Sequence, residues 1–177
     1  MLTPTLETAR VQMRPLTAAD AETVYAAWAS DPEVTRYMRY NTHTSVQDTL
    51  EWLSSEEANA SKDTYYNWGL VLKESGALFG SGGIAETDGV FMLGYNIARP
   101  YWGLGLMTEA ARGMLEFAVE TLGAREFFAY HAKENPASGR VLEKLGFVYR
   151  QDGEFVSLDG ARAYPSREYT LSVPARR

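Results

Sequence analysis

The sequence contains no cysteine and only two histidines among its 177 residues. Without cysteine the chain can form no disulfide, no thiolate metal site and no thiol nucleophile. The two histidines, His43 and His131, are too few for a convincing zinc site. We therefore expect no metal.

Long apolar runs and an excess of basic residues are also missing. No apolar run reaches membrane-spanning length, and the first ten residues, MLTPTLETAR, lack the basic start and apolar core of a signal peptide. We therefore expect a cytoplasmic protein with no membrane partner. The 17 basic residues are outnumbered by 23 acidic ones, which gives a net charge of -6. This balance disfavours nucleic acid as a partner and suits a cation such as an amine.

The composition is that of an ordinary globular chain, with 45% hydrophobic and 23% charged residues. A chain of 177 residues can bury a core of its own and has the size of one domain. No linker, repeat or low-complexity segment interrupts it. We expect a single domain over residues 1–177, as a monomer or a homodimer.

The most informative stretch runs from Leu93 to Gly123, LGYNIARPYWGLGLMTEAARGMLEFAVETLG. An apolar segment that ends near Ile97 is followed by a Pro-Tyr-Trp break and a glycine turn, Gly103 to Gly105. Apolar residues then recur at steps of three and four, which predicts a long amphipathic helix. The free N–H groups and the positive dipole end at such a helix start form a site for an anion such as phosphate.

Two common phosphate-binding motifs do not fit this turn. A Walker loop needs a lysine after its last glycine, but Leu106 follows Gly105. A dinucleotide fingerprint needs a third glycine where Thr108 stands, and no second nucleotide-binding unit follows the acidic Glu126. Taken alone, the stretch is also compatible with a glycine turn that merely links a strand to a helix.

The rest of the chain predicts an antiparallel sheet flanked by helices. Alternation and turn residues predict strands at residues 9–15, three strands over 66–97, one at 126–132 and two over 147–173. Cap residues predict helix starts at Thr17, Asp31, Ser45 and Asn135. Because a helix connects the strand before the glycine turn to the strand at 126–132, these two strands should be parallel neighbours in a mixed sheet.

A second motif, ENPASGRVLEKLGF from Glu134 to Phe147, combines an Asn135-Pro136 helix start with a Gly146 stop. Together with PYWGLGLMTEA and the helix and strand between them, it resembles the GNAT acyl-CoA N-acetyltransferases. Within that family the chain is most similar to the ribosomal-protein N-terminal (alanine/serine) acetyltransferase branch. The resemblance covers nearly the whole chain. It implies the GNAT α/β (α+β) fold: a mixed, mostly antiparallel sheet with flanking helices and one splayed parallel strand pair.

The resemblance also implies acetyl-CoA as the co-substrate. Its pantetheine arm would lie between the splayed strands, against the main chain of Asn96 to Ala98. The family pattern Gln/Arg-x-x-Gly-x-Gly/Ala falls on Trp102, Gly105 and Met107, and the first and last of these depart from it. Met107 would narrow the phosphate site unless its side chain points into the core. The expected coenzyme-binding residues are Asn96, Ile97, Ala98, Trp102, Gly103, Leu104, Gly105, Leu106, Met107, Thr108, Asn135, Ser138 and Arg140, with Lys133 and Lys144 as further partners for the nucleotide phosphates.

Two residues are expected to handle protons. Ser138 is an ordinary first-turn residue, and the resemblance adds a hydrogen bond or proton for the leaving thiolate; where many relatives carry a tyrosine for this purpose, Leu142 stands here. Glu86 is a candidate base acting through a water, and His131 is the alternative with the better intrinsic pKa. Each has a simpler interpretation, Glu86 as a solvated carboxylate and His131 as a packed core residue.

These inferences predict direct transfer of acetyl from acetyl-CoA to a primary amine, without a covalent enzyme intermediate. Weak bases suffice for an α-amine, so we expect the acceptor to be a protein or peptide N-terminus. The segment Arg36 to Thr44, rich in tyrosine and arginine, is expected either to select the acceptor or simply to pack. Two alternatives stay open: an antibiotic or polyamine N-acetyltransferase, and a non-catalytic acyl-CoA-binding regulator.

Overall fold

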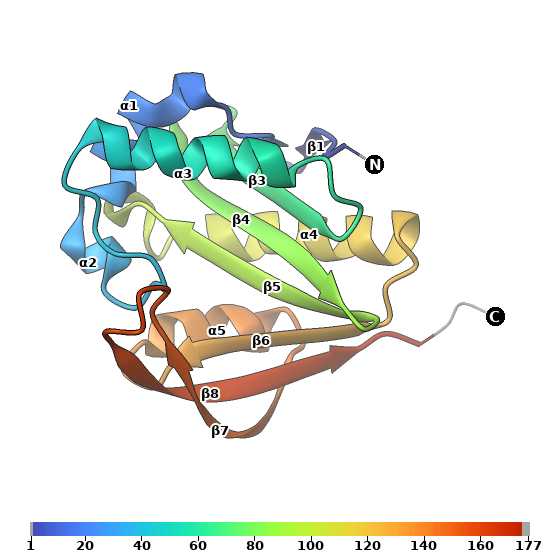
Figure 1. Ribbon diagram of the computed structural model, residues 1–177. Coiled ribbons are helices and arrows are strands. Elements are labelled where there is room, and N and C mark those ends of the chain that lie inside the picture. Colours follow the sequence, from blue (N-terminus) through green and yellow to red (C-terminus); the bar gives the residue numbers. More distant parts are fainter. Residues whose placement is uncertain (1, 175–177) are drawn as a thin grey trace.

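The computed structural model describes residues 2–174, which form one eight-stranded sheet with helices on both faces (Figure 1). The strands lie in the order β1-β2-β3-β4-β5-β6-β8-β7. Their bounds are β1 Leu6–Glu7, β2 Val11–Arg14, β3 Tyr65–Leu72, β4 Leu78–Thr87, β5 Val90–Ile97, β6 Glu126–Ala132, β7 Val148–Val156 and β8 Ala163–Ser172. The α-helices are α1 Ala21–Val24, α2 Pro32–Thr35, α3 Val46–Asn59, α4 Leu106–Thr121 and α5 Pro136–Lys144.

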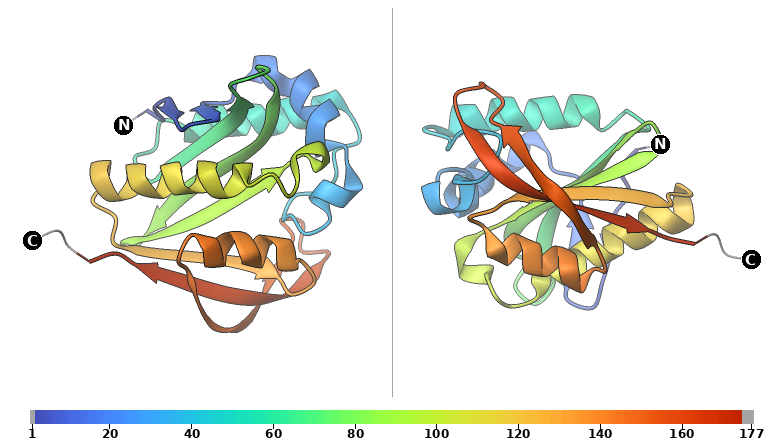
Figure 2. Two further views of the ribbon diagram at one scale, coloured as in Figure 1. Left: turned by 180° about the vertical axis from the view of Figure 1, so that it is seen from behind. Right: turned by 90° about the horizontal axis from the view of Figure 1, so that it is seen from below.

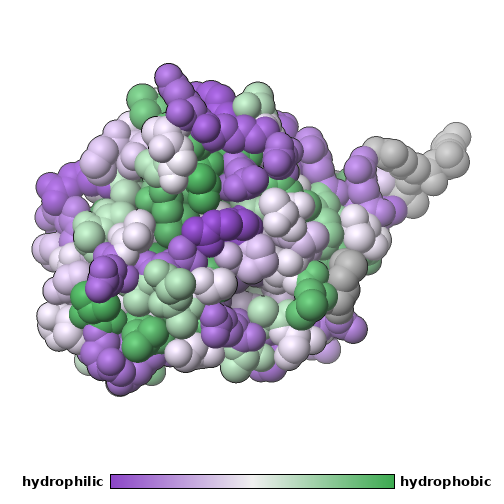
Figure 3. All heavy atoms as spheres, turned by 90° about the horizontal axis from the view of Figure 1, so that it is seen from above, coloured by the Kyte–Doolittle hydropathy of each residue, from purple (hydrophilic) through white to green (hydrophobic). Residues whose placement is uncertain are grey.

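Helices α1, α2 and α3 lie on one face of the sheet, and α4 and α5 lie on the other (Figures 1 and 2). The larger core fills the space between the sheet and α4, where Met114 and Phe117 pack with Trp68 and Phe127. A smaller core around Trp28 and other buried residues lies under α1 and α3. Seen from above, hydrophilic residues cover much of the surface, with smaller hydrophobic areas between them (Figure 3). No helix within residues 2–174 is long and apolar enough to span a bilayer.

The predicted helix starts are confirmed by their caps. Thr17 and Ser45 each form a capping box with the aspartate three residues later, and the Asp31 carboxylate accepts a hydrogen bond from the Glu33 main-chain N–H. The end of α5 is also as predicted: the Phe147 N–H donates to the Leu142 carbonyl across a Gly146 with a φ of +91°. Local side-chain chemistry therefore sets where these helices begin and end.

The predicted parallel pair is confirmed, and it separates along its length. Strands β5 and β6 are paired only from Val90 opposite Glu126 to Met92 opposite Phe128. Beyond Met92, β5 continues to Ile97 and β6 continues to Ala132 with no pairing between them. The mixed sheet thus opens at the carboxyl ends of its parallel strands.

The structure also contains elements that the sequence patterns did not predict. The short β1 pairs with β2 through Leu6 opposite Met13, and at two residues it is too short to show a periodic pattern. The first helix, expected as one unit, passes from a 3-10 turn at Ala18–Asp20 through α1 into a π turn at Tyr25–Ala29. A 3-10 turn at Arg99–Tyr101 follows β5.

Candidate active site

A cavity of about 450 Å³ opens where β5 and β6 separate. Four parts of the chain line it: the end of β5, the glycine turn with the start of α4, the start of α5, and α2 with the loop after it. Most of the predicted coenzyme residues line this cavity: Asn96, Ile97, Trp102, Gly103, Gly105, Leu106, Met107, Thr108, Asn135, Ser138 and Arg140. Ala98 and Leu104 do not line it.

The glycine turn has the geometry expected of an anion site. Gly103 and Gly105 both have a φ of +75°, in the left-handed region that glycine adopts without strain. Gly105 is the N-cap of α4, and the first hydrogen bond of the helix runs from the Glu109 N–H to the Gly105 carbonyl. The N–H groups of Leu106 to Thr108 therefore precede the helical ladder, at the positive end of the helix dipole.

Met107 is buried at the start of α4. Only 4% of this residue is exposed, and it belongs to the larger core together with Leu106 and Ala110. Its side chain thus packs with the core beneath the start of α4, and the residue also lines the cavity.

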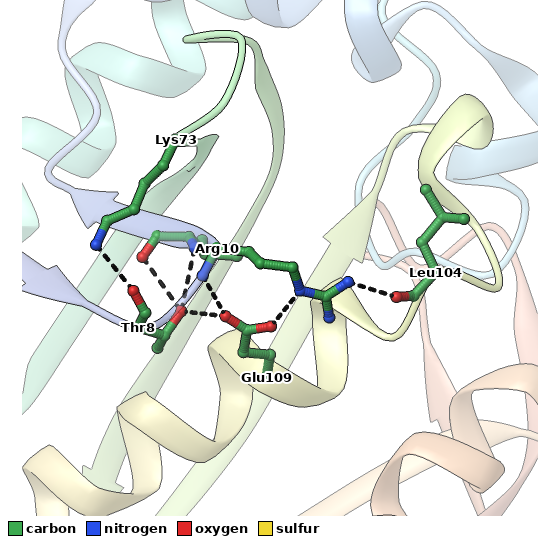
Figure 4. Close-up of polar contacts among 6 residues, drawn as sticks. Thr8, Arg10, Lys73, Leu104 and Glu109 are labelled. Atoms are coloured by element: carbon green, nitrogen blue, oxygen red, sulfur yellow. Dashed lines mark hydrogen bonds and ion pairs between the residues drawn. The ribbon is translucent and has the colours of Figure 1, made fainter.

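A polar network holds the outer side of the same turn (Figure 4). The Arg10 guanidinium donates from Nη1 to the Leu104 carbonyl at 3.1 Å and from Nε to the Glu109 carboxylate at 2.7 Å. The other Glu109 oxygen accepts the Thr8 hydroxyl at 2.6 Å and the Arg10 main-chain N–H at 2.7 Å. The Leu104 carbonyl is thereby directed away from the cavity, toward the β1–β2 connection.

The main chain of β5 presents alternate residues to the gap. The Ala98 N–H donates to the Phe79 carbonyl on β4, at 2.8 Å. Because consecutive residues of a strand direct their main-chain groups to opposite sides, Asn96 shares this direction, and Tyr95 and Ile97 face the gap. The Ile97 carbonyl accepts the Trp102 indole N–H at 2.7 Å. Of the three residues expected to meet pantetheine, the structure therefore directs only the Ile97 main chain into the gap.

The start of α5 forms the opposite wall. Asn135 caps the helix through a 3.3 Å hydrogen bond from the Ser138 N–H, as predicted. The Tyr95 hydroxyl crosses from β5 to lie 3.0 Å from Ser138 Oγ and 3.1 Å from the Ser138 carbonyl. Burial raises the pKa of Tyr95, and its hydrogen bond with Ser138 offsets this rise only in part. This tyrosine therefore remains protonated at neutral pH, as a hydrogen-bond donor beside the predicted serine.

A further wall of the cavity is formed by α2 and the loop of residues 36–44. Arg36, Tyr37 and Met38 line the cavity together with Glu33 and Val34 of α2. The later part of the loop has a packing role, since Tyr40 and His43 lie against Trp52 of α3. The later part of the loop therefore packs, while acceptor selection by the part that lines the cavity stays a prediction.

The β7–β8 hairpin fixes the 36–44 loop in place. The Leu158 N–H donates to the Arg39 carbonyl at 2.7 Å, and the Tyr164 hydroxyl donates to the Arg36 carbonyl at 3.0 Å. Arg162 donates to the Asn41 side chain at 2.7 Å and to the Tyr40 carbonyl at 3.2 Å. Both side-chain and main-chain groups of the loop are therefore tied to one hairpin.

Neither predicted base lines this cavity. Glu86 lies beside the β4–β5 turn, where its carboxylate accepts the Gly89 N–H at 2.6 Å, and it lines a separate depression at the other end of the strand. His131 is 6% exposed and packs beneath α5, with Nδ1 2.7 Å from the Ala132 carbonyl and Nε2 3.4 Å from the Tyr169 hydroxyl. In the structure Glu86 therefore lies away from Ser138. His131 is a packed core residue, which is the simpler of its two interpretations.

Two of the three cations suggested for the phosphates lie at the cavity. Arg140 and Lys144 of α5 line it and are exposed. Lys133 instead forms a 2.6 Å ion pair with Asp152 of β7 and does not line the cavity. A coenzyme phosphate would thus meet two cations one helical turn apart, in addition to the N–H groups of the glycine turn.

A GNAT acetyltransferase domain model matches residues 10–148 of this chain. The chain belongs to the GNAT acetyltransferase family. It is 29% identical over 147 residues to the uncharacterized N-acetyltransferase YoaA of Bacillus subtilis, covering 81% of this chain and 82% of YoaA. It is 30% identical over 148 residues to the uncharacterized protein YkkB of the same organism, covering 81% and 85% of the two chains.

The fold of this GNAT protein also matches solved structures. A candidate ribosomal-protein-serine acetyltransferase from Vibrio cholerae superimposes with a TM-score of 0.86 at 21% identity, over 98% of this chain and 100% of the other. The predicted fold is thereby confirmed, including the mixed sheet and the splayed parallel pair.

Two groups of functional interest were missed by the sequence patterns. Tyr95 stands in the apolar strand segment before the glycine turn, and nothing in that segment marks its contact with Ser138, 43 positions away. The contact of Arg10 with Glu109 joins residues 99 positions apart, and no local pattern marks it.

Proposed function

We propose that this GNAT enzyme transfers acetyl from acetyl-CoA directly to the α-amino group at the N-terminus of a protein or peptide. The observation that supports an α-amine as the acceptor is the lack of a strong base at the cavity. Among the described residues that line it there is no histidine, and Glu33 is the one carboxylate.

The residues at the cavity suit the coenzyme. Its pyrophosphate fits the N–H groups that precede the α4 ladder, with Arg140 and Lys144 as counter-charges. The gap-facing main chain of Tyr95 and Ile97 offers hydrogen bonds to a pantetheine amide. Bound there, acetyl-CoA supplies an activated thioester. Ser138, at the start of α5, would donate a hydrogen bond to the departing thiolate.

Amine ionisation then selects the acceptor. An α-amine has a pKa of about 7.7 to 8.0, so roughly a tenth of it is neutral and nucleophilic at pH 7. A lysine side chain, with a pKa of about 10.4, has well under a hundredth in that form. Glu33 is exposed and can attract a cationic amine, but an exposed carboxylate is a weak base. The cavity therefore suits an amine that needs little help to lose its proton.

The charge of the whole chain and the likeness to the Vibrio cholerae protein support the same acceptor class. A net charge of -6 attracts basic segments such as those common in ribosomal proteins. That structural neighbour is itself a candidate ribosomal-protein-serine acetyltransferase.

A peptide panel tests the proposal. The purified protein and acetyl-CoA are incubated with a basic peptide that has a free N-terminus and no lysine, and with the same peptide formylated at the N-terminus and carrying one internal lysine. Spermidine and an aminoglycoside complete the panel. Mass spectrometry should locate acetyl on the free α-amine only. Acetylation of the small amines with both peptides unmodified would contradict the proposal and indicate a small-molecule acetyltransferase. Binding of acetyl-CoA without any turnover would indicate a non-catalytic regulator.

A further inference from the structure

The Tyr95 hydroxyl holds a position that the proposed chemistry has not yet used. It reaches from β5 across the gap to Ser138 at the first turn of α5, and both residues line the cavity. The phenol has one proton but two acceptors within range, Ser138 Oγ at 3.0 Å and the Ser138 carbonyl at 3.1 Å. Only one of the two can receive that proton at a time.

The two possible arrangements differ in what Ser138 can do. If Tyr95 donates to the carbonyl, the Ser138 hydroxyl can donate to the Tyr95 oxygen, and its proton is not free for a ligand. If Tyr95 donates to Ser138 Oγ, the serine proton is free to point into the cavity. No other hydrogen bond of Ser138 Oγ is formed within residues 2–174, so rotation of two hydroxyl protons converts one arrangement into the other.

We infer that Tyr95 is a positioning residue for acetyl transfer, which orients the Ser138 hydroxyl toward the coenzyme sulfur as the thiolate leaves. This inference rests on the proposed use of Ser138. In the step, the amine nitrogen forms a bond to the acetyl carbon, the carbon–sulfur bond breaks, and the electron pair departs on sulfur. The amine proton passes to water. Both hydroxyls keep their protons and only change the atoms to which they donate.

Physical chemistry favours this role over proton transfer. Hydroxyl groups are far weaker acids than a thiol, which ionises at about pH 8.5, so the thiolate leaves without being protonated by Ser138. A hydrogen bond to an ion is stronger than one between neutral groups, so the arrangement that frees the serine proton gains stability as charge develops on sulfur. In that arrangement the Tyr95 proton satisfies the Ser138 oxygen and strengthens its donation.

The test compares Tyr95→Phe, Ser138→Ala and the double variant with the wild type in steady-state kinetics. The acceptor is the free N-terminal peptide. Tyr95→Phe should lower kcat about tenfold and leave the KM for acetyl-CoA unchanged, because the hydroxyl acts on the leaving group and not on binding. In the Ser138→Ala background, the second change should lower kcat no further, since the group that Tyr95 orients is already gone.

The matched control is Tyr130→Phe, which removes a hydroxyl from the neighbouring β6 at a ring that packs with Phe128 and Phe155 away from the cavity. It should retain wild-type kinetics. A wild-type kcat in Tyr95→Phe, or a further loss in the double variant, would overturn the role of Tyr95. A wild-type protein without turnover on any amine would overturn the proposed function, and this role with it, so the two failures are distinct.

Discussion

At the residue scale, Gly105 combines a backbone requirement with the coenzyme site. Its φ of +75° is strained for a β-branched residue, at a cost of about 1–3 kcal/mol. A backbone shift that relieves this strain would move the N–H groups at the start of α4, so Gly105→Val should weaken acetyl-CoA binding by about tenfold or more, measured by calorimetry on the folded variant. Gly76→Val is the control, since Gly76 has a φ of +71° in the β3–β4 turn, away from the cavity. Equal coenzyme affinity in both variants would refute the phosphate site.

A substitution at Met107 should change the stability of the fold and leave coenzyme binding unchanged. Because its side chain lies in the core, Met107→Ala should lower the free energy of unfolding by about 2–5 kcal/mol. The Kd for acetyl-CoA should remain as in the wild type. Urea unfolding and calorimetry measure the two quantities. Tighter coenzyme binding in the variant would show instead that methionine crowds the phosphate.

At the scale of elements, the Arg10–Glu109 contact connects the β1–β2 strands with α4. Burial alone would raise the pKa of Glu109, but hydrogen bonds from Thr8 and Arg10 outweigh burial and hold the pKa below its ordinary value of 4.5. The carboxylate thus contributes stability that is present above pH 4.5 and is lost as the pH falls through the lowered pKa of the folded state.

Glu109→Gln tests this contribution. Between roughly pH 6 and pH 3, the wild type should lose more stability than the variant, so that their difference in unfolding free energy shrinks on acidification. Urea unfolding at several pH values measures the difference. A difference that stays constant over this range would show that the charge of Glu109 contributes nothing. At pH 7 the variant should also have a higher KM for acetyl-CoA, because the Arg10 contact to Leu104 is loosened.

The link between the hairpin and the 36–44 loop predicts a complementary effect. Arg162→Met removes the hydrogen bonds to Tyr40 and Asn41 without touching the glycine turn. We expect the KM for the acceptor peptide to rise several-fold, while the Kd for acetyl-CoA stays the same. Arg167→Met, within β8 and with its guanidinium over the Tyr149 ring, is the control for the nearby Arg162, which directly precedes β8. Parallel losses in both variants would point to general damage to β8.

At the scale of the whole molecule, net charge should act on the acceptor. With a charge of -6, the protein should bind a basic acceptor peptide less well as salt is raised from about 0.02 to about 0.2 M, because screening weakens long-range attraction. The KM for a neutral peptide of the same length should change little. Equal salt dependence for the two peptides would show that charge does not select the acceptor.

Features that depend on local chemistry were predictable from the sequence. The caps at Thr17, Ser45 and Asn135 depend on residues within one turn, and the parallel pair follows from a strand, helix, strand order. Contacts between distant residues were not predictable, since Tyr95 meets Ser138 across 43 positions and no pattern in either segment marks the pairing.

The position of Glu86 is a different case, because the sequence contains the information that fixes it. An Asp88-Gly89 turn places Glu86 opposite Phe91, beside the turn, and the carboxyl end of β5 lies opposite Gly80 at the far end of the pair. Counting the register from that turn would have placed Glu86 away from the cavity. A strand has two ends, and only its pairing tells which end faces the site.

The ties between the β7–β8 hairpin and the 36–44 loop also bear on how the enzyme matures on the ribosome. Partners such as Arg39 with Val156 and Arg36 with Tyr164 are 117 and 128 positions apart, so the loop emerges long before the residues that hold it. The glycine turn and α5 are synthesised in between. A nascent chain can therefore contain the glycine turn and α5 first, and its 36–44 loop is fixed only when the last two strands have been translated and have paired.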